Sequence, residues 1–181
     1  MRIVVSGTHA TGKSTLVADL GTALGDHEIL GDPWELVDDD LPLGSAASFA
    51  AQLEAAAERL LGLAPGADVV VERGPLDLMA YLLALGELGR PAPSPAALEP
   101  LRALTARATA RVDLLVVLPL AGVHGLYVPE EEDLDLRAAA DGCLLDLLDD
   151  DEVLPPSVAV LEVAGPPEAR VAAVLAALGR G

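Results

Sequence analysis

The sequence predicts an α/β protein built on a parallel β-sheet, and two observations lead to that prediction. Short runs rich in Val, Leu and Ile alternate along the chain with longer segments of helical pattern, as they do in βαβ units. The first apolar run leads into a glycine-rich loop and then into a helix, which is an order typical of such units. With 181 residues, the chain is expected to form one domain, 1–181.

Each expected element follows from its local pattern. Strands are predicted where short apolar runs end at charged or turn-forming residues, over 2–6, 28–30, 69–72, 114–118 and 158–163. Helices are predicted between them, over 13–24, 46–63, 75–88, 94–111, 134–148 and 167–178. Pro75 and Pro95 stand in the first turn of their helices, where proline is tolerated because its missing N–H would have no partner.

The loop after the first strand has the sequence G-x-x-x-x-G-K-[ST] of a Walker A motif, or P-loop. Its backbone N–H groups are expected to point into one concavity at a helix N-terminus and to bind a triphosphate. Lys13 would reach the β- and γ-phosphates, and the Ser14 hydroxyl would ligate Mg²⁺. The residues expected to contact the nucleotide are Gly7, Thr8, His9, Ala10, Thr11, Gly12, Lys13, Ser14 and Thr15. The alternative, a chance glycine turn before a helix, is disfavoured by the matching flanks.

The composition excludes several kinds of partner. The formal net charge is −18, whereas a nucleic-acid groove or a protein that binds anionic membranes needs a basic face. The single cysteine, Cys143, cannot form an internal disulfide, and no apolar run is long enough to cross a bilayer. We therefore expect a cytoplasmic protein that binds neither nucleic acid nor membrane. The Ala/Leu-rich helix over 46–63 fits either a core or a homodimer face, and both interpretations stay open.

Charged residues follow the third predicted strand, at the edge where parallel sheets bind ligands. Glu72 is suited to hold a Mg²⁺-bound water or to accept a proton, and Arg73 is suited to clamp a phosphoryl group. The alternative is a strand-end ion pair followed by a helix start, in which Asp77 caps the first turn.

Asp32 follows the second predicted strand and lies beside the only tryptophan, Trp34. A carboxylate next to an aromatic surface suits a substrate that carries both a ring and a hydroxyl group. The alternative is a turn residue before Pro33 and a partly buried Trp. Phe49 and Gln52 share one face of the next helix and would line the same pocket, although Phe49 also fits the core.

Together these motifs resemble those of the P-loop nucleoside and nucleotide kinase superfamily. The resemblance implies a three-layer fold with strand order 2-3-1-4-5, the use of ATP with Mg²⁺, and a lid after the fourth strand. It also implies that Asp32 is the general base, Glu72 the carboxylate on the metal side and Arg73 the arginine on the phosphate side. Gly74 departs from the Glu-Arg-Ser element of deoxynucleoside kinases, and the run 72–82 more closely resembles small AAA-family ATPases related to nicotinamide riboside kinase domains.

The expected lid, at about 120–137, is unusually acidic for this superfamily. Within 121–137 it contains one arginine, Arg137, among Glu130, Glu131, Glu132, Asp133 and Asp135. Arg137 is the candidate lid arginine, with a helical i,i+4 pair to Asp133 or Asp141 as its alternative.

Three functions are compatible with these patterns. The leading hypothesis is a kinase that transfers the γ-phosphoryl group of ATP to a hydroxyl or phosphate of a small metabolite. Its candidate catalytic residues are Lys13, Asp32, Glu72, Arg73 and Arg137, and its acceptor would contact Asp32, Trp34, Phe49, Gln52 and Arg73. The alternatives are a nucleotide-dependent regulator or NTPase without an acceptor, and a protein that binds nucleotide without chemistry.

Overall fold

The computed structural model describes residues 1–37, 40–122 and 132–180. Five parallel strands form one sheet in the order β2-β3-β1-β4-β5, as predicted. The strands are β1 (Arg2–Ser6), β2 (Glu28–Leu30), β3 (Val69–Glu72), β4 (Leu114–Val117) and β5 (Ala159–Glu162). The helices are α1 (Lys13–Leu24), α2 (Ala46–Gly62), α3 (Pro75–Glu87), α4 (Pro95–Thr109), α5 (Leu134–Leu148) and α6 (Pro167–Ala177). Two short 3₁₀ helices, η1 (Pro33–Leu36) and η2 (Leu120–Gly122), follow β2 and β4.

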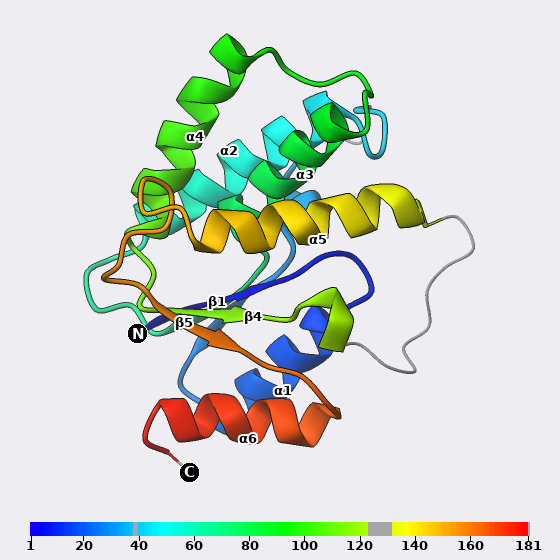
Figure 1. The fold of residues 1–181 in the computed structure, drawn as a ribbon. Helices are drawn as coiled ribbons and strands as arrows, with labels where there is room; N and C mark the ends of the chain where they lie inside the picture. The colour runs from blue at the N-terminus through cyan, green and yellow to red at the C-terminus, as the bar shows by residue number, and fades with distance from the viewer. Residues whose placement is uncertain (38–39, 123–131, 181) are drawn as a thin grey trace.

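Helices cover both faces of the sheet and give three layers (Figure 1). Helices α1 and α6 lie on one face, and α2, α3 and α5 lie on the other. Successive side chains of a strand point to opposite faces, so Val4 joins the core under α3 while Ile3 and Val5 join the core above α1. Because both faces are buried, the central strands are continuous apolar runs.

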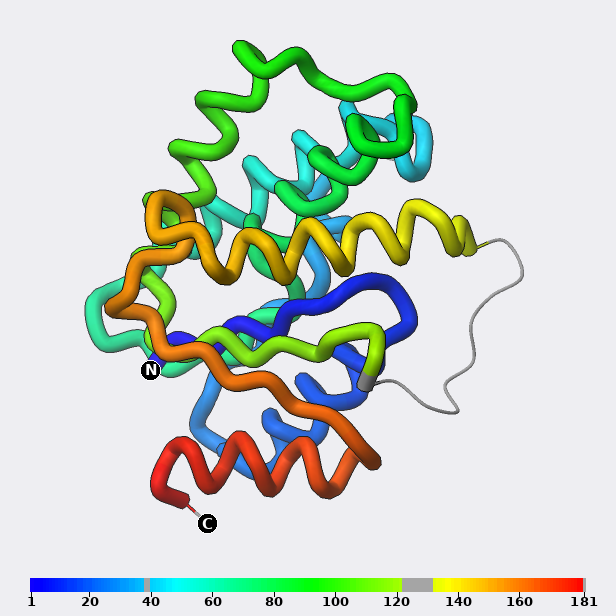
Figure 2. Tube along the Cα trace, in the orientation of Figure 1, coloured from blue at the N-terminus to red at the C-terminus, as the bar shows by residue number. Residues whose placement is uncertain are grey.

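The predicted elements agree with the structure to within two residues at each end. The sequence did not predict η1, which is too short to show a helical period. Asp32 starts this turn, because its Oδ1 accepts a hydrogen bond from the backbone N–H of Trp34 at 3.0 Å. The backbone trace in Figure 2 shows β1 (blue), β4 (green) and β5 (orange) side by side.

The expected lid overlaps two elements of the described structure. Its first residues belong to η2, and residues 134–137 form the first turn of α5. The segment 123–131, which includes His124, Glu130 and Glu131, lies outside the described residues. The lid as a separate functional unit therefore stays a prediction.

Helix α2 buries one face in the core of this chain, where it packs against α3 and α4. Its role as a homodimer face stays a prediction. Cys143 is buried in α5, as a small core residue would be. No helix in the described part of the chain combines the length and apolar character needed to cross a membrane.

Candidate active site

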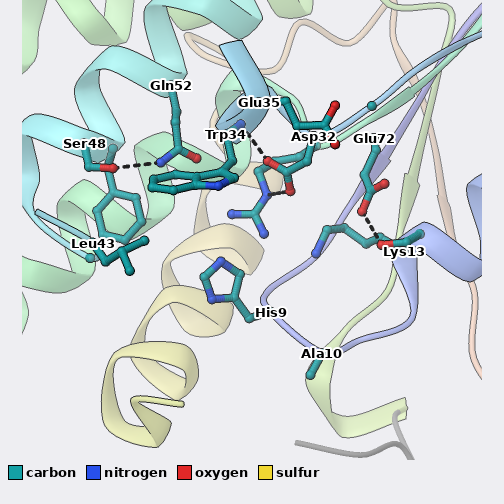
Figure 3. A pocket seen from close by; sticks show the side chains of 15 residues that line it. His9, Ala10, Lys13, Asp32, Trp34, Glu35, Leu43, Ser48, Gln52 and Glu72 are labelled. Atoms are coloured by element: carbon teal, nitrogen blue, oxygen red, sulfur yellow. Dashed lines mark hydrogen bonds and ion pairs between the residues drawn. The ribbon is translucent and has the colours of Figure 1, made fainter. Parts of the chain in front are cut away.

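A cavity of about 620 Å³ opens at the carboxyl ends of β1, β2 and β3. We name its two ends after their predicted roles: the phosphate end, where Ala10, Lys13 and Glu72 lie, and the acceptor end, where Trp34, Leu43 and Gln52 lie (Figure 3). The described residues that line it come from the phosphate loop, the β2–α2 connection, α2 and the end of β3: His9, Ala10, Lys13, Ser14, Gly31, Asp32, Trp34, Glu35, Leu43, Gly44, Ser48, Phe49, Gln52, Glu72 and Arg73.

The predicted nucleotide-binding residues divide into three groups. Four line the cavity: His9, Ala10, Lys13 and Ser14. Gly7, Thr8 and Thr11 are buried within the loop, and Gly12 is partly buried. Thr15 is exposed on α1 and does not line the cavity in the described structure. Its contact with a nucleotide stays a prediction.

The loop requires glycine at its first position. Gly7 has φ +148°, and a Cβ there would lie 2.8 Å from the Leu118 carbonyl oxygen and 2.9 Å from Thr11 Oγ1. Any other side chain would therefore displace either β4 or the loop itself. Gly12, directly before α1, has φ +89° in the left-handed region that favours glycine.

A buried carboxylate fixes the start of the phosphate loop. Asp77 Oδ1 accepts a hydrogen bond from the Gly7 N–H at 2.6 Å, and its Oδ2 accepts from the Ser6 hydroxyl at 2.7 Å. The same Oδ2 accepts from the Gly74 N–H at 3.0 Å, which confirms the predicted capping role. Asp77 therefore ties the end of β1 to the start of α3, a link between distant segments that the sequence did not predict.

Two buried arginines hold the outer side of the loop. Arg137 donates to the carbonyls of His9 (2.7 Å) and Ala10 (3.1 Å). Arg170 donates to the carbonyls of Thr11 (2.8 Å) and Gly165 (2.8 Å). In a planar trans peptide the C=O and the following N–H point in opposite directions. These contacts therefore turn three successive loop N–H groups away from the arginines.

Arg137 occupies a different position from the one expected of a lid arginine. It is buried against loop carbonyls and does not line the cavity in the described structure. Its candidate helical partner Asp133 instead forms an ion pair with Arg90. A direct contact between Arg137 and the transferred phosphoryl group stays a prediction. The sequence analysis did not identify Arg170, because no local motif marks a residue whose contact lies across the fold.

Lys13 is buried beneath the cavity, and its Nζ donates to the Thr8 carbonyl at 2.7 Å. Loss of hydration on burial and the nearby Arg73 charge together lower the pKa of Lys13 to about 7. A bound phosphate would offset both effects, because an adjacent anion favours the charged amine.

The two predicted metal ligands lie together. The Ser14 hydroxyl donates to Glu72 Oε1 at 2.6 Å (Figure 3). A hydroxyl and a carboxylate are hard oxygen ligands of the type that Mg²⁺ prefers. Among the described residues, no group of three or more His, Cys, Asp or Glu could hold a metal by itself. The two residues therefore fit an ion that also takes ligands from phosphate and water.

Asp32 stands between the two ends of the cavity and belongs both to a turn and to the site. Its Oδ2 lies 3.1 Å from Nε of the buried Arg73, whose backbone has φ +61°. Arg59 donates to the neighbouring Gly31 carbonyl at 2.7 Å and fixes the backbone next to Asp32. Asp32 is therefore a turn residue, as one interpretation predicted, and an ion pair joins it to Arg73 inside the cavity. The roles of Asp32 as general base and of Arg73 as phosphoryl clamp stay predictions.

Tyr81, on α3, links the phosphate loop to the acceptor end and was missed by the sequence analysis. Its hydroxyl accepts a hydrogen bond from the His9 N–H at 3.0 Å. Its ring stacks on Phe49 at 4.7 Å between centroids, and the Arg73 guanidinium lies 5.7 Å from the ring centre. Burial raises the pKa of Tyr81 to about 12 and keeps the hydroxyl protonated. The expectation that the His9 N–H faces the phosphates is therefore wrong in this structure, because Tyr81 takes that donor.

Phe49 and Gln52 are both buried and both line the cavity, so Phe49 is a core residue and a wall of the site at once. Gln52 Nε2 donates to the Ser48 hydroxyl at 3.0 Å, which fixes the amide close to Trp34 (Figure 3).

His9 has no charge to contribute. Burial and the nearby Arg73 lower its pKa to about 3. Its Nδ1 lies 3.2 Å from Oε1 of Glu132, so the contact is a hydrogen bond from a neutral ring rather than an ion pair.

Comparison with known proteins places the fold. No protein-family model and no curated protein matches the sequence. A deoxyadenosine kinase from M. mycoides with bound dATP is 12% identical, with a TM-score of 0.69 over 99% of this chain and 100% of that chain. The same enzyme with bound dCTP gives 13% identity and a TM-score of 0.70 over 99% of both chains. A thymidylate kinase from Candida albicans is 18% identical, with a TM-score of 0.68 over 98% of this chain and 90% of that chain. The chain therefore has the P-loop kinase fold.

Proposed function

We propose that this protein is an ATP-dependent phosphotransferase acting on a nucleoside-like, nucleotide-like or other small metabolite. One observation carries the proposal. The phosphate loop and the Asp32–Arg73 ion pair open into the same cavity, which also has an aromatic acceptor end. The nucleoside and nucleotide kinases that share the fold support this assignment.

The reaction would join an acceptor oxygen to the γ-phosphorus of ATP and break the bond between that phosphorus and the β,γ-bridging oxygen. ADP leaves, and Asp32 takes the proton of the acceptor hydroxyl. Lys13 binds the β- and γ-phosphates, and Arg73 stabilises the charge on the transferred group. Arg137 and Arg170 keep the loop amides in place without touching the substrate, so in this scheme they are positioning residues.

Ser14 and Glu72 are the residues that would hold Mg²⁺. The ion supplies positive charge for the phosphates and completes its coordination with water and phosphate oxygens. Their hydrogen bond already places both oxygens at the phosphate end of the cavity, next to Lys13.

A second candidate is an NTPase or nucleotide-dependent regulator without an acceptor. The observation in its favour is the position of Arg137, the expected lid arginine, against the loop carbonyls rather than in the cavity. The resemblance of 72–82 to small AAA-family ATPases related to nicotinamide riboside kinase domains also fits this candidate. In either case we expect a cytoplasmic protein.

An acceptor panel separates the two candidates. ATP consumption is measured with nucleosides, nucleotides and other hydroxylated metabolites, each against a reaction without acceptor. A kinase is stimulated by one class of acceptor and forms the phosphorylated product in equal amount to ADP. Consumption that no acceptor changes would reject the kinase and support the NTPase. Lys13→Ala serves as the control for contaminating ATPases.

A further inference from the structure

We infer that the acceptor enters the cavity without a phosphate group of its own, as an uncharged hydroxyl compound. This inference rests on the proposed phosphotransferase function and chooses between its two kinds of acceptor, a hydroxyl and a phosphate. The observation behind it is the small number of positive charges available to the cavity and the number of carboxylates that line it.

All positive side chains of this protein can be located. The chain has 11 Lys and Arg residues, and the sequences of 38–39, 123–131 and 181 contain none of them, so all lie within the described residues. Of these, Lys13 and Arg73 line the cavity.

The other nine, also among the described residues, do not line the cavity. Arg137 and Arg170 bind carbonyls of the phosphate loop. Arg59 donates to the Gly31 carbonyl, its charge acts on Asp32 and Glu35, and its Nε and Nη2 have no hydrogen-bond partner in the described structure. Arg90 pairs with Asp133, and Arg102 pairs with Asp150. Arg2 and Arg111 bind the carbonyls of Arg111 and Leu63. Arg107 and Arg180 are exposed, on α4 and after α6.

The two positive charges of the cavity are already committed. Lys13 belongs to the loop that would bind the phosphates of ATP, and its Nζ is held at the Thr8 carbonyl. Arg73 is buried, its Nε is paired with Asp32 at 3.1 Å, and in the proposed reaction its other N–H groups bind the transferred phosphoryl group. A second phosphate group, on the acceptor, would therefore have to compete with ATP for both Arg73 and Lys13.

Carboxylates would repel such a group. Asp32, Glu35 and Glu72 all line the cavity, and a phosphate monoester carries about −1.5 to −2 charges at pH 7. Glu35 is exposed, and its carboxylate lies beside Gly31, on the side of Asp32 that faces Glu72 (Figure 3). The three carboxylates therefore disfavour a second anion in the part of the cavity between Asp32 and Glu72, next to the acceptor end.

Two backbone amides of residues that line the acceptor end already have partners. The Ser48 N–H, in the first turn of α2, donates to the Ser45 hydroxyl at 3.1 Å. The Trp34 N–H donates to Asp32 at 3.0 Å. An anion would have to displace these partners to bind either amide.

The remaining walls suit an uncharged ring. Trp34 and Phe49 offer aromatic surface, and Gln52 offers an amide that is held in place by Ser48. An apolar pocket with a few placed polar groups is the usual design of a small-molecule site. The acceptor is thus expected to carry a neutral ring and a free hydroxyl near Asp32, as an unphosphorylated nucleoside does.

Binding of matched pairs tests this inference directly. Trp34, the only tryptophan, reports binding by fluorescence, with Mg²⁺ and a non-hydrolysable ATP analogue present. Each of the common nucleosides, and ribose, is compared with its own 5′-phosphate. We expect the unphosphorylated member of at least one pair to bind at least tenfold more tightly. A monophosphate that binds as tightly as its unphosphorylated partner or more tightly, or a lack of response to every unphosphorylated compound, would overturn the inference.

The same binding data keep this inference separate from the proposed function. A protein that binds the unphosphorylated compounds preferentially but transfers no phosphoryl group would refute the kinase and leave the choice of acceptor intact. Transfer to monophosphates alone would support the kinase and refute the choice of acceptor.

A charge substitution provides an independent test. Glu35→Arg replaces a negative charge that lines the cavity with a positive one. We expect it to tighten monophosphate binding at least tenfold, while Glu54→Arg, on an exposed position of α2, leaves that binding unchanged. Unchanged monophosphate affinity in Glu35→Arg would contradict the charge argument, and a circular dichroism spectrum shows that the variant is folded.

Discussion

The two ends of the cavity are built in different ways. At the phosphate end, Asp77, Arg137 and Arg170 are 1%, 6% and 5% exposed and bond to the loop backbone from α3, α5 and α6. At the acceptor end, Leu43 is 79% exposed, and the wall is made of side chains on the β2–α2 connection and α2. The difference shows that one half of the site is fixed by buried bonds to its backbone, while the other half is lined by side chains that range from the buried Phe49 and Gln52 to the exposed Leu43.

This difference matches the chemistry that each end would perform. Amides that bind phosphate must point in fixed directions, because a hydrogen bond weakens steeply when it is misaligned. A ring is held mainly by apolar contact, which tolerates small displacements. The phosphate end should therefore be sensitive to residues that never touch the ligand, and the acceptor end should be sensitive only to residues that do.

The largest effect is expected from Asp32→Asn, which changes the base but not the phosphate end. Removal of a general base lowers turnover about 10²–10⁴-fold, and the affinity for Mg–ATP should stay within a factor of two or so. Steady-state kinetics with the acceptor found in the panel, together with ATP titration, measure both quantities. Full turnover in this variant would show that another group takes the proton.

Arg170→Met tests whether the phosphate end depends on residues outside the cavity. It leaves the Thr11 and Gly165 carbonyls without their buried donor, which costs about 1–3 kcal/mol in the free energy of unfolding. Because the loop amides lose their support, we also expect about tenfold weaker ATP binding. Urea unfolding and calorimetric titration measure the two effects.

Arg107→Met is the matched control, because Arg107 is exposed on α4. It should change neither stability nor ATP binding. If Arg170→Met behaves like this control, the phosphate loop keeps its shape without the arginine, and the contrast between the two ends is lost.

Trp34→Leu should affect the acceptor end alone. Loss of the aromatic surface is expected to raise the acceptor KM about tenfold, because stacking on an aromatic side chain contributes about 1–3 kcal/mol in related sites. The KM for ATP should not change. Equal changes in both KM values would mean that the two ends are coupled more closely than their construction indicates.

The smallest effect concerns the pH dependence of stability. The pKa of His9 is about 3 in the folded protein and near its ordinary value of 6.5 in the unfolded chain, so the unfolded chain binds more protons between these values. The stabilisation is complete above pH 6.5 and is lost as the pH falls toward 3. Urea unfolding at pH 7.5 and 5 should show a smaller loss for His9→Gln than for the wild type. An equal loss of stability in both proteins would show that a group other than His9 causes the pH dependence.

The fold was predictable because local patterns determine it. Continuous apolar runs identified the buried strands, Pro75 and Pro95 marked helix starts, and the loop sequence identified the phosphate end. The turn η1 could not be predicted, because its four residues are too few to show a helical period of hydrophobicity.

The long-range contacts that hold the site in place could not be predicted in the same way. Arg170 and Thr11 are 159 positions apart in the sequence, and Tyr81 and His9 are 72 apart. Such contacts depend on how helices pack on the sheet, and no local spacing encodes them. Asp77 was identified as a helix cap from its neighbours, but its bond to Gly7 across the fold was not.

The central claim is that the phosphate end is complete in the free protein and depends on Lys13. Calorimetric titration of Mg–ATP without any acceptor, into the wild type and Lys13→Ala, tests it most directly, with Arg107→Ala as the control. We predict that the wild type and the control bind Mg–ATP with similar affinity, and that Lys13→Ala, shown to be folded by circular dichroism, binds at least tenfold more weakly. Undiminished binding by Lys13→Ala, or no binding by the wild type, would contradict it.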